Sequence, residues 1–217
     1  MFNHHYISIC KDLSTIVIHD IIGYINIKGG NSMTLYFIRH ARTTMNTAGL
    51  WSGRTDCSIT PEGAEKARES FSFTSDEFDH FYCSPLQRTK QTLEAILEEP
   101  FEPRIDARII ERNFGEWEGR PYSILTSEET QKYIDGEIQP PNGETFQQVK
   151  DRVIDFVTEM FSKYRGNEKI LICSHATVCR MVRDVFLPNM EKKPIGNAQL
   201  IEVTESDFND FKRRQEK

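Results

Sequence analysis

Five side chains in this 217-residue sequence are of types that bind and transfer a phosphate group. They are two imidazoles, His40 and His175, two guanidiniums, Arg39 and Arg88, and one carboxylate, Glu111. A guanidinium fork matches the oxygens of a phosphate, and an imidazole or a carboxylate can exchange protons during a reaction. If the fold brings these five groups together, they form a phosphate pocket.

Short apolar runs are the elements that must position these side chains. Each candidate residue follows such a run, and the runs are typical of strands that a sheet buries on both faces. Ligands of open α/β sheets bind at the carboxyl ends of the strands, so this placement favours a shared site. The predicted strands are residues 35–38, 78–83, 104–110, 169–173 and 199–203.

Helical patterns alternate with these runs. The triplet Thr60-Pro61-Glu62 combines an N-cap hydroxyl, a proline and an acid, and predicts a helix start. A second helix is predicted from Ser84-Pro85, a long one from near Glu144 to Gly166, and another over residues 178–186. The alternation predicts an α/β fold with three layers, in which a doubly wound, mostly parallel sheet carries helices on both faces.

Four motifs carry the candidate residues in a fixed order. They are LYFIRHART at residues 35–43 with Asn46, SPLQRT at 84–89, ERNFGEWEG at 111–119 and CSH at 173–175. Together they resemble the motifs of the histidine phosphatase superfamily, whose members include phosphoglycerate mutases. The resemblance spans about residues 33–203.

The resemblance implies a phosphoglycerate mutase-like fold and a phosphoryl transfer through a phosphohistidine, without a metal or other cofactor. His40 would be the nucleophile, and Glu111 would protonate the leaving oxygen and later deprotonate the attacking water. The other residues would surround the substrate: catalytic His175, phosphate-binding Arg39, Asn46 and Arg88, and substrate-binding Thr43, Ser52 and Gly53.

Two features leave alternatives open. Glu116 and Glu118 lie close enough in the sequence to compete with Glu111 for the role of the acid. Ala41 and Ala176 stand where glycine is common in the family, and a methyl group would cost activity there if a positive φ were required. A relative that only binds a phosphorylated ligand is therefore an alternative to an enzyme.

The segment over residues 122–141 bears on the choice between a hydrolase and a mutase. It is short and acidic, and Lys132 is its one basic residue. A mutase must hold its substrate tightly and exclude water, which calls for a substantial cover. The cofactor-dependent mutases of the family that the chain resembles carry a longer and more basic insertion there. The sequence therefore favours a phosphatase that acts on a small phosphorylated metabolite over a phosphoglycerate mutase.

Composition argues against several other classes of protein. A hydrophobic fraction of 38% and a charged fraction of 28% indicate a folded chain, and a net charge of −6 disfavours binding to nucleic acid or to a membrane surface. The five cysteines contain no Cys-x-x-Cys pair, which argues against a zinc cluster and favours reduced thiols in the cytoplasm. The oligomeric state is not indicated.

Residues 1–32 differ from the remainder of the chain. They are rich in isoleucine and end in Gly29-Gly30-Asn31-Ser32, which has the composition of a flexible linker. The predicted organisation is an N-terminal extension over residues 1–32, followed by a histidine phosphatase domain over residues 33–217. The alternative is that the extension adds a strand or helix to the domain.

Overall fold

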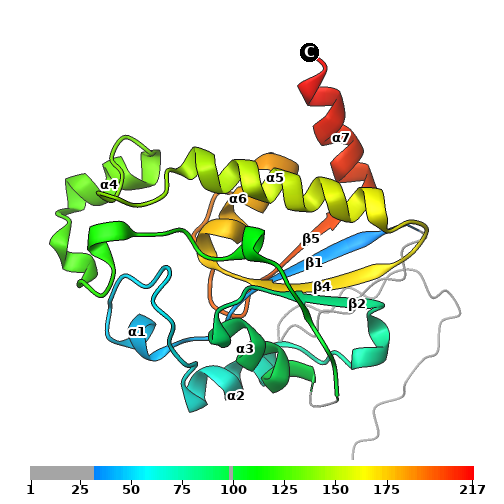
Figure 1. Ribbon diagram of the computed structural model, residues 1–217, viewed down its shortest axis with the longest axis horizontal. Helices are drawn as coiled ribbons and strands as arrows, with labels where there is room; N and C mark the ends of the chain where they lie inside the picture. Colours follow the sequence, from blue (N-terminus) through cyan, green and yellow to red (C-terminus); the bar gives the residue numbers. More distant parts are fainter. Residues whose placement is uncertain (1–31, 98–99) are drawn as a thin grey trace, which may run out of the picture.

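The computed structural model describes residues 32–97 and 100–217 and is built on a five-stranded sheet (Figure 1). Its strand order is β3-β2-β4-β1-β5. Three pairings are parallel, and β5 alone runs antiparallel to its neighbour β1. The prediction of an α/β fold with a mostly parallel sheet is confirmed. The strands are β1 (Thr34–Arg39), β2 (His80–Cys83), β3 (Arg104–Ile105), β4 (Lys169–Ser174) and β5 (Leu200–Thr204).

Seven α-helices accompany the sheet in the described part of the chain. Short 3-10 turns lie at Ser75–Glu77, Ala107–Ile109, Gly115–Trp117 and Tyr122–Ile124. The helices are α1 (Thr44–Thr47), α2 (Pro61–Ser70), α3 (Gln87–Leu97), α4 (Ser127–Asp135), α5 (Phe146–Lys163), α6 (Ala176–Phe186) and α7 (Glu205–Gln215).

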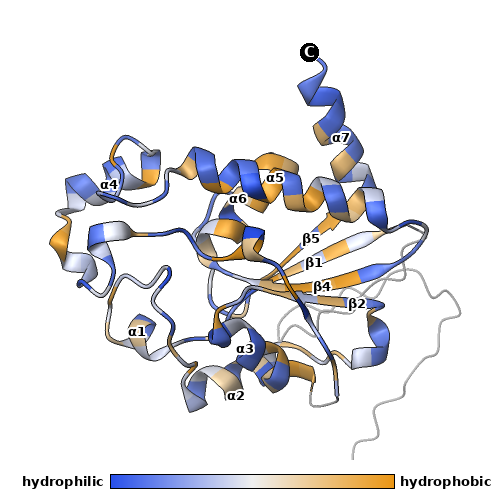
Figure 2. Ribbon diagram, viewed as in Figure 1, coloured by the Kyte–Doolittle hydropathy of each residue, from blue (hydrophilic) through white to orange (hydrophobic). Residues whose placement is uncertain are grey.

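Helices cover both faces of the sheet, with α2 and α3 on one side and α5 and α6 on the other (Figure 1). Successive side chains of a strand point to opposite faces, so β1 serves two separate cores. Leu35 and Phe37 belong to the core beneath α5, α6 and α7, and Tyr36 and Ile38 belong to the core above α2 and α3. Figure 2 accordingly colours the central strands as hydrophobic and much of the outer helix surface as hydrophilic.

The predicted starts of α2 and α5 agree with local capping chemistry, whereas the helix expected from Ser84-Pro85 begins at Gln87. Thr60 caps α2 by accepting a hydrogen bond from the Gly63 N–H, with Pro61 as the first helical residue. Thr145 and Gln148 form a capping box that begins α5. The apolar stripe of that long helix is buried as predicted, through Val149, Val153, Phe156, Val157 and Met160.

Strand register brings the candidate residues to one edge of the sheet. Arg39 pairs with Ser174 at the ends of β1 and β4, so His40 and His175 follow adjacent strand ends. The chain leaves β1 toward β2 across one face, and leaves β4 toward β5 across the other. The β1/β4 boundary is therefore the switch point where open α/β sheets form their ligand crevice.

One predicted strand is largely wrong. The strand expected over residues 104–110 is only Arg104–Ile105, because the Asp106 side chain accepts a hydrogen bond from the Arg108 N–H and starts a 3-10 turn. Ile109 is still buried in the core, but it reaches the core from this turn. The predictions for residues 1–31, including the linker and the possible extra element, lie outside the described residues.

Candidate active site

His40 lies at the carboxyl end of β1 and is almost fully buried, with 4% of its surface exposed. Its Nδ1 lies 2.7 Å from the Ala41 carbonyl oxygen. A carbonyl can only accept, so Nδ1 carries the proton and Nε2 keeps a free lone pair. Burial, reinforced by the positive charges of Arg88 and Arg39, holds the pKa of His40 well below its usual value. The ring is thus a neutral imidazole whose Nε2 can act as a nucleophile.

His175 lies beside this ring, with the two ring centroids 5.2 Å apart. Its Nδ1 accepts a hydrogen bond of 3.3 Å from Arg88 Nε, so its Nε2–H donates to Ser84 Oγ at 2.7 Å. Burial and the charge of Arg88 hold the pKa of His175 well below its usual value. The two histidines are therefore both neutral but carry their protons on opposite nitrogens.

Arg88 is fully buried near the start of α3. Besides its bond to His175, it donates to the carbonyl oxygens of Gly53 at 2.8 Å and Thr55 at 3.0 Å, with a longer contact to Ser52. Backbone carbonyls solvate its charge inside the protein without neutralising it. The guanidinium therefore contributes a positive charge beside both imidazoles.

The loop that receives Arg88 is held in place by Glu118. This carboxylate accepts hydrogen bonds from the N–H groups of Gly53, Arg54, Thr55 and Phe114 and from the Thr55 hydroxyl. Partial burial raises the pKa of Glu118, but these hydrogen bonds outweigh it and leave the pKa below its usual value. Because its carboxylate oxygens accept hydrogen bonds that hold this loop, Glu118 is not placed to exchange protons with a substrate.

Ser52 and Gly53, predicted to contact substrate, are integral parts of this loop. The Ser52 hydroxyl donates to the Thr55 carbonyl at 3.3 Å, and the Gly53 N–H is bonded to Glu118. A Cβ at Gly53 would lie 2.1 Å from the Arg112 carbonyl oxygen, so no other residue fits without a shift of the backbone. Their observed contacts position Arg88.

Thr43 and Asn46 form a capping box at the short helix α1. The buried Thr43 hydroxyl accepts from the Asn46 N–H, and Asn46 Oδ1 accepts from the Thr43 N–H. Asn197 Nδ2 also reaches Asn46 Oδ1 and the His40 carbonyl. Within the described residues, the Asn46 Nδ2 has no hydrogen-bond partner, so this amide retains a donor for a phosphate.

Glu111 is buried between two backbone donors. Its carboxylate accepts from the Arg112 N–H at 2.8 Å and from the Thr177 N–H at 3.4 Å, in the first turn of α6. The competing Glu116 is exposed and bonded to Asn142. Among the three candidate acids, Glu111 is the one buried next to the helix that follows His175.

Arg39 ends β1, and its Nη1 donates to the Ile195 carbonyl. Its Nε is buried and has no hydrogen-bond partner in the described part of the chain. Burial lowers the pKa of Arg39, while the nearby Glu111 raises it. Arg39 is therefore a charged side chain with donor capacity to spare at the edge of the site.

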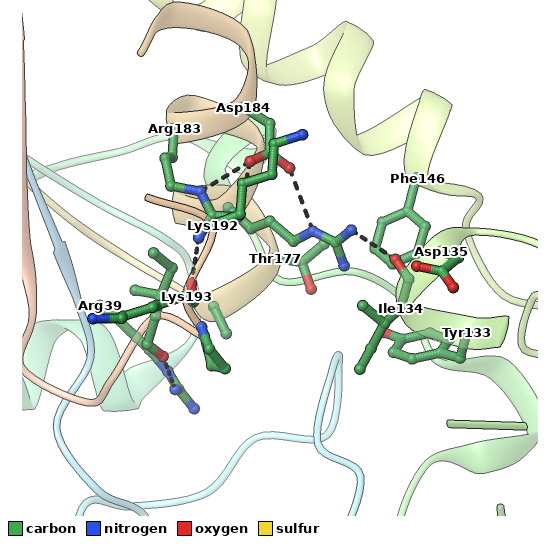
Figure 3. A pocket seen from close by; sticks show the side chains of 14 residues that line it. Arg39, Tyr133, Ile134, Asp135, Phe146, Thr177, Arg183, Asp184, Lys192 and Lys193 are labelled. Carbon is green, nitrogen blue, oxygen red and sulfur yellow. Dashed lines mark hydrogen bonds and ion pairs between the residues drawn. The ribbon is translucent and has the colours of Figure 1, made fainter. Parts of the chain in front are cut away.

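A cavity of about 740 Å³ adjoins these residues; we call it the α6 cavity (Figure 3). Arg39 and the first turn of α6 form the wall that it shares with the histidine site. The remaining walls come from the end of α4, the start of α5, the later turns of α6 and the loop after it. They include Tyr133, Phe146, Arg180, Lys192 and Ile195.

The family model of the histidine phosphatase superfamily (branch 1) matches residues 35–214. The chain belongs to this superfamily. The match covers every candidate residue from Arg39 to His175, and the histidine phosphatase fold accounts for the convergence of their strand ends.

Relatives of this histidine phosphatase have different named activities. It is 31% identical to the adenosylcobalamin/alpha-ribazole phosphatase of Salmonella typhimurium, over 69% of this chain and 77% of the relative. It is 26% identical to a 2,3-bisphosphoglycerate-dependent phosphoglycerate mutase of Rhizobium etli, over 69% and 78%. The crystal structure of TTHB049 from Thermus thermophilus superposes with a TM-score of 0.65 at 25% identity, covering 79% of this chain and 93% of that one.

The alanines that depart from the family pattern cause no backbone strain. Ala41 and Ala176 are not among the described residues with positive φ, whose non-glycine members are Asn142 and Ala198. Ala41 is buried, and its N–H donates to Thr92 Oγ1 at 2.9 Å. The methyl groups are accommodated in this histidine phosphatase without the cost that a positive φ would impose.

Three residues that support the site were not predicted as site residues. Ser84 lies in a recognised motif, but its bond to His175 requires knowledge of the strand order. Asn197 donates to the His40 carbonyl from 157 positions away in the chain. The sequence suggests Glu118 only as a candidate acid. Their roles depend on tertiary contacts that no local pattern encodes.

The other histidines lie away from this site or outside the described residues. His80 is at the start of β2 and pairs with Glu168 at 3.1 Å, whereas His4, His5 and His19 lie outside. In residues 32–97 and 100–217, no three His, Cys, Asp or Glu side chains are grouped to hold a metal ion. Over the same ranges, no helix is long and apolar enough to cross a membrane.

Proposed function

We propose that this histidine phosphatase hydrolyses a small phosphate monoester through a phosphohistidine at His40. The observation that carries the proposal is the hydrogen bond from His40 Nδ1–H to the Ala41 carbonyl, which leaves Nε2 unprotonated. Because burial and two arginines keep the ring neutral, the nucleophile needs no separate base to activate it.

The reaction has two balanced steps. In the first, His40 Nε2 forms a bond to phosphorus while the bond from phosphorus to the leaving oxygen breaks, and Glu111 supplies the proton to that oxygen. In the second, Glu111 takes a proton from water, whose oxygen attacks the phosphohistidine and releases phosphate and neutral His40. One carboxylate serves both steps, as acid and then as base.

The surrounding charges stabilise the transferring group. Arg88 and Arg39 supply positive charge, and Asn46 supplies a neutral N–H donor for the equatorial oxygens. The ring of His175, whose one N–H donates to Ser84, holds Arg88 beside His40. Preorganised charge of this kind accounts for most of the catalysis in phosphoryl transfer. Because Arg88 is already fixed by three carbonyls and His175, little reorganisation is needed when the substrate's phosphate arrives.

The helix α4 supports hydrolysis over mutase activity. Its Lys132 pairs with Glu128 at 2.7 Å, and Glu129 is used to cap the helix. Its last residue, Asp135, contributes a negative charge to the α6 cavity. This helix therefore supplies no unpaired cation to retain an anionic intermediate.

Trapping the intermediate tests the proposal. Turnover of radiolabelled 4-nitrophenyl phosphate, quenched within milliseconds in base, should leave an acid-labile, base-stable phosphate on the protein. The His40→Ala variant should form no adduct. A base-stable adduct that persists in this variant would overturn the assignment of the nucleophile, as would activity that chelation removes and a divalent ion restores. Absence of turnover would favour the ligand-binding alternative.

The mutase alternative is tested on the same protein. After priming with 2,3-bisphosphoglycerate, we expect release of phosphate from monoesters to be much faster than interconversion of 3-phosphoglycerate and 2-phosphoglycerate. The opposite order would establish the mutase and would mean that residues outside α4 supply the cover.

A further inference from the structure

The α6 cavity is rich in positive charge although the whole chain has a net charge of −6. Five cationic side chains line it, and only two carboxylates, Asp135 and Asp184, do so. Figure 3 shows Lys192 and Lys193 across the cavity from the rings of Tyr133 and Phe146. A large basic hollow on an acidic protein is suited to binding an anion.

The carboxylates of this cavity do not cancel its charge. Asp184 is paired with Arg183 at 2.8 Å and with Arg180 at 3.4 Å, so one carboxylate faces two guanidiniums. Asp135 accepts two hydrogen bonds of 3.0 Å from the Gln131 amide. Lys193 pairs with Glu191 at 2.9 Å. Lys192 has no ion-pair or hydrogen-bond partner within the described ranges, so the cavity keeps an excess of positive charge.

Two contacts fix the Arg180 side chain in this cavity. Its Nη2 donates to the Ile134 carbonyl at 2.8 Å, and its guanidinium lies 4.7 Å from the centre of the Phe146 ring. These contacts fix the side chain, while its Nη1 has no partner among the described residues. A fixed guanidinium loses little conformational entropy when it binds an anion.

Arg39 connects this cavity to the phosphate pocket. It lines the cavity and directly precedes His40, and the first turn of α6 borders both sites. A substrate whose phosphate lies at His40 can therefore extend its alcohol part into the cavity.

We infer that the α6 cavity is a specificity subsite in which Arg180 and Lys192 bind a second anionic group, a carboxylate or phosphate, on the leaving-group side of the substrate. This inference rests on the phosphatase function proposed above and names its substrate class, monoesters with two separate anionic groups. The cations come from α6 and the loop after it, outside the acidic segment 122–141.

Binding of unreactive phosphonates tests the subsite without requiring turnover. Three ligands share the benzylphosphonate core and carry, in the para position, a carboxylate, the isosteric carboxamide or a methylphosphonate. By isothermal titration calorimetry, we expect at least one of the two anionic ligands to bind about tenfold more tightly than the carboxamide. The arm that shows the preference identifies the second group as carboxylate or phosphate.

Substitutions test whether Arg180 and Lys192 cause the tighter binding of the anionic ligands. Arg180→Gln and Lys192→Gln should each bring the anion-to-amide affinity ratio close to one, and Lys192 is exposed, so its substitution leaves the core intact. The matched control Lys66→Gln removes an exposed charge on α2, across the sheet, and should leave the ratio unchanged. Raising the salt concentration should reduce the preference in the unaltered protein.

The outcomes separate this inference from the proposed function. Equal binding of all three ligands, no binding of any, or a preference that survives in both variants would overturn the subsite. Turnover of 4-nitrophenyl phosphate, measured on the same samples, reports on the phosphatase proposal alone. A retained preference without turnover would preserve the subsite and overturn the hydrolase.

Discussion

At the scale of single residues, the site is defined by where protons reside. His40 and His175 are close neighbours with similar burial, yet their hydrogen-bond partners fix opposite tautomers. The partner of His40 is a carbonyl of its own strand end, whereas His175 is fixed by Arg88 and Ser84. The sequence indicated both histidines, but the tautomers depend on contacts between residues far apart in the chain.

Nitrogen NMR of the two rings tests this arrangement. We expect His40 to carry its proton on Nδ1 and His175 on Nε2. Both pKa values are lowered, so both rings should remain neutral as the pH falls through the ordinary histidine pKa of about 6.5. His40→Gln and His175→Gln assign the signals. Identical tautomers, or protonation of either ring near pH 6.5, would contradict the proposed network.

The role of Glu111 predicts a dependence on the leaving group. Glu111→Gln removes the transferable proton, so alkyl phosphates should react about 10²–10⁴-fold more slowly. 4-Nitrophenyl phosphate should be affected far less, because its leaving group needs no protonation. The measurement is kcat/KM for both substrates, with thermal unfolding to check that the variant folds. Equal slowing of the two substrates would transfer the acid role to another group.

At the scale of elements, helices were predicted more successfully than loops. The start of α2 follows from Thr60 and Pro61, and α5 follows from an apolar stripe, because both signals are local. The prediction of a strand over residues 104–110 is largely wrong, because the Asp106 side chain accepts a hydrogen bond from the backbone N–H of Arg108. The loop over residues 52–55 could not be predicted, since its anchor, Glu118, is more than sixty positions away.

That anchor can be tested by one substitution. Glu118→Gln replaces a carboxylate oxygen with an amide nitrogen that cannot accept hydrogen bonds, and should lower the free energy of unfolding by about 1–3 kcal/mol. It should also reduce kcat, because the loop that fixes Arg88 loosens. The pKa of Glu118 lies below its usual value, so this stabilisation is complete at neutral pH and is lost as the pH falls through the lowered pKa.

Urea unfolding and steady-state kinetics measure both effects. Glu116→Gln is the matched control, because Glu116 is exposed and makes one side-chain hydrogen bond, to Asn142. The control should change stability by less than about 0.5 kcal/mol. If the two variants behave alike, Glu118 is not the residue that holds the loop.

At the scale of the whole molecule, the sheet begins at Thr34, and all proposed site residues follow it. Met33 is buried in the core with 1% of its surface exposed. We expect a chain that begins at Met33 to fold with an unfolding midpoint close to that of the full chain and to keep its activity. Calorimetry and turnover of 4-nitrophenyl phosphate check this. An insoluble or much less stable product would mean that residues before Met33 contribute to the core.

The antiparallel direction of β5 determines where a label or tag can be attached to this protein without blocking the site. Because β5 returns toward the origin of β1, the Glu205 N–H at the start of α7 donates to the Met33 carbonyl at 3.1 Å. The start of α7 therefore lies at the end of the sheet opposite His40 and His175. Figure 1 shows α7 ending far from α1 and α4. A fluorescent label, an affinity tag or a surface tether joined at Lys217 stands clear of the pocket and leaves the path of the substrate open.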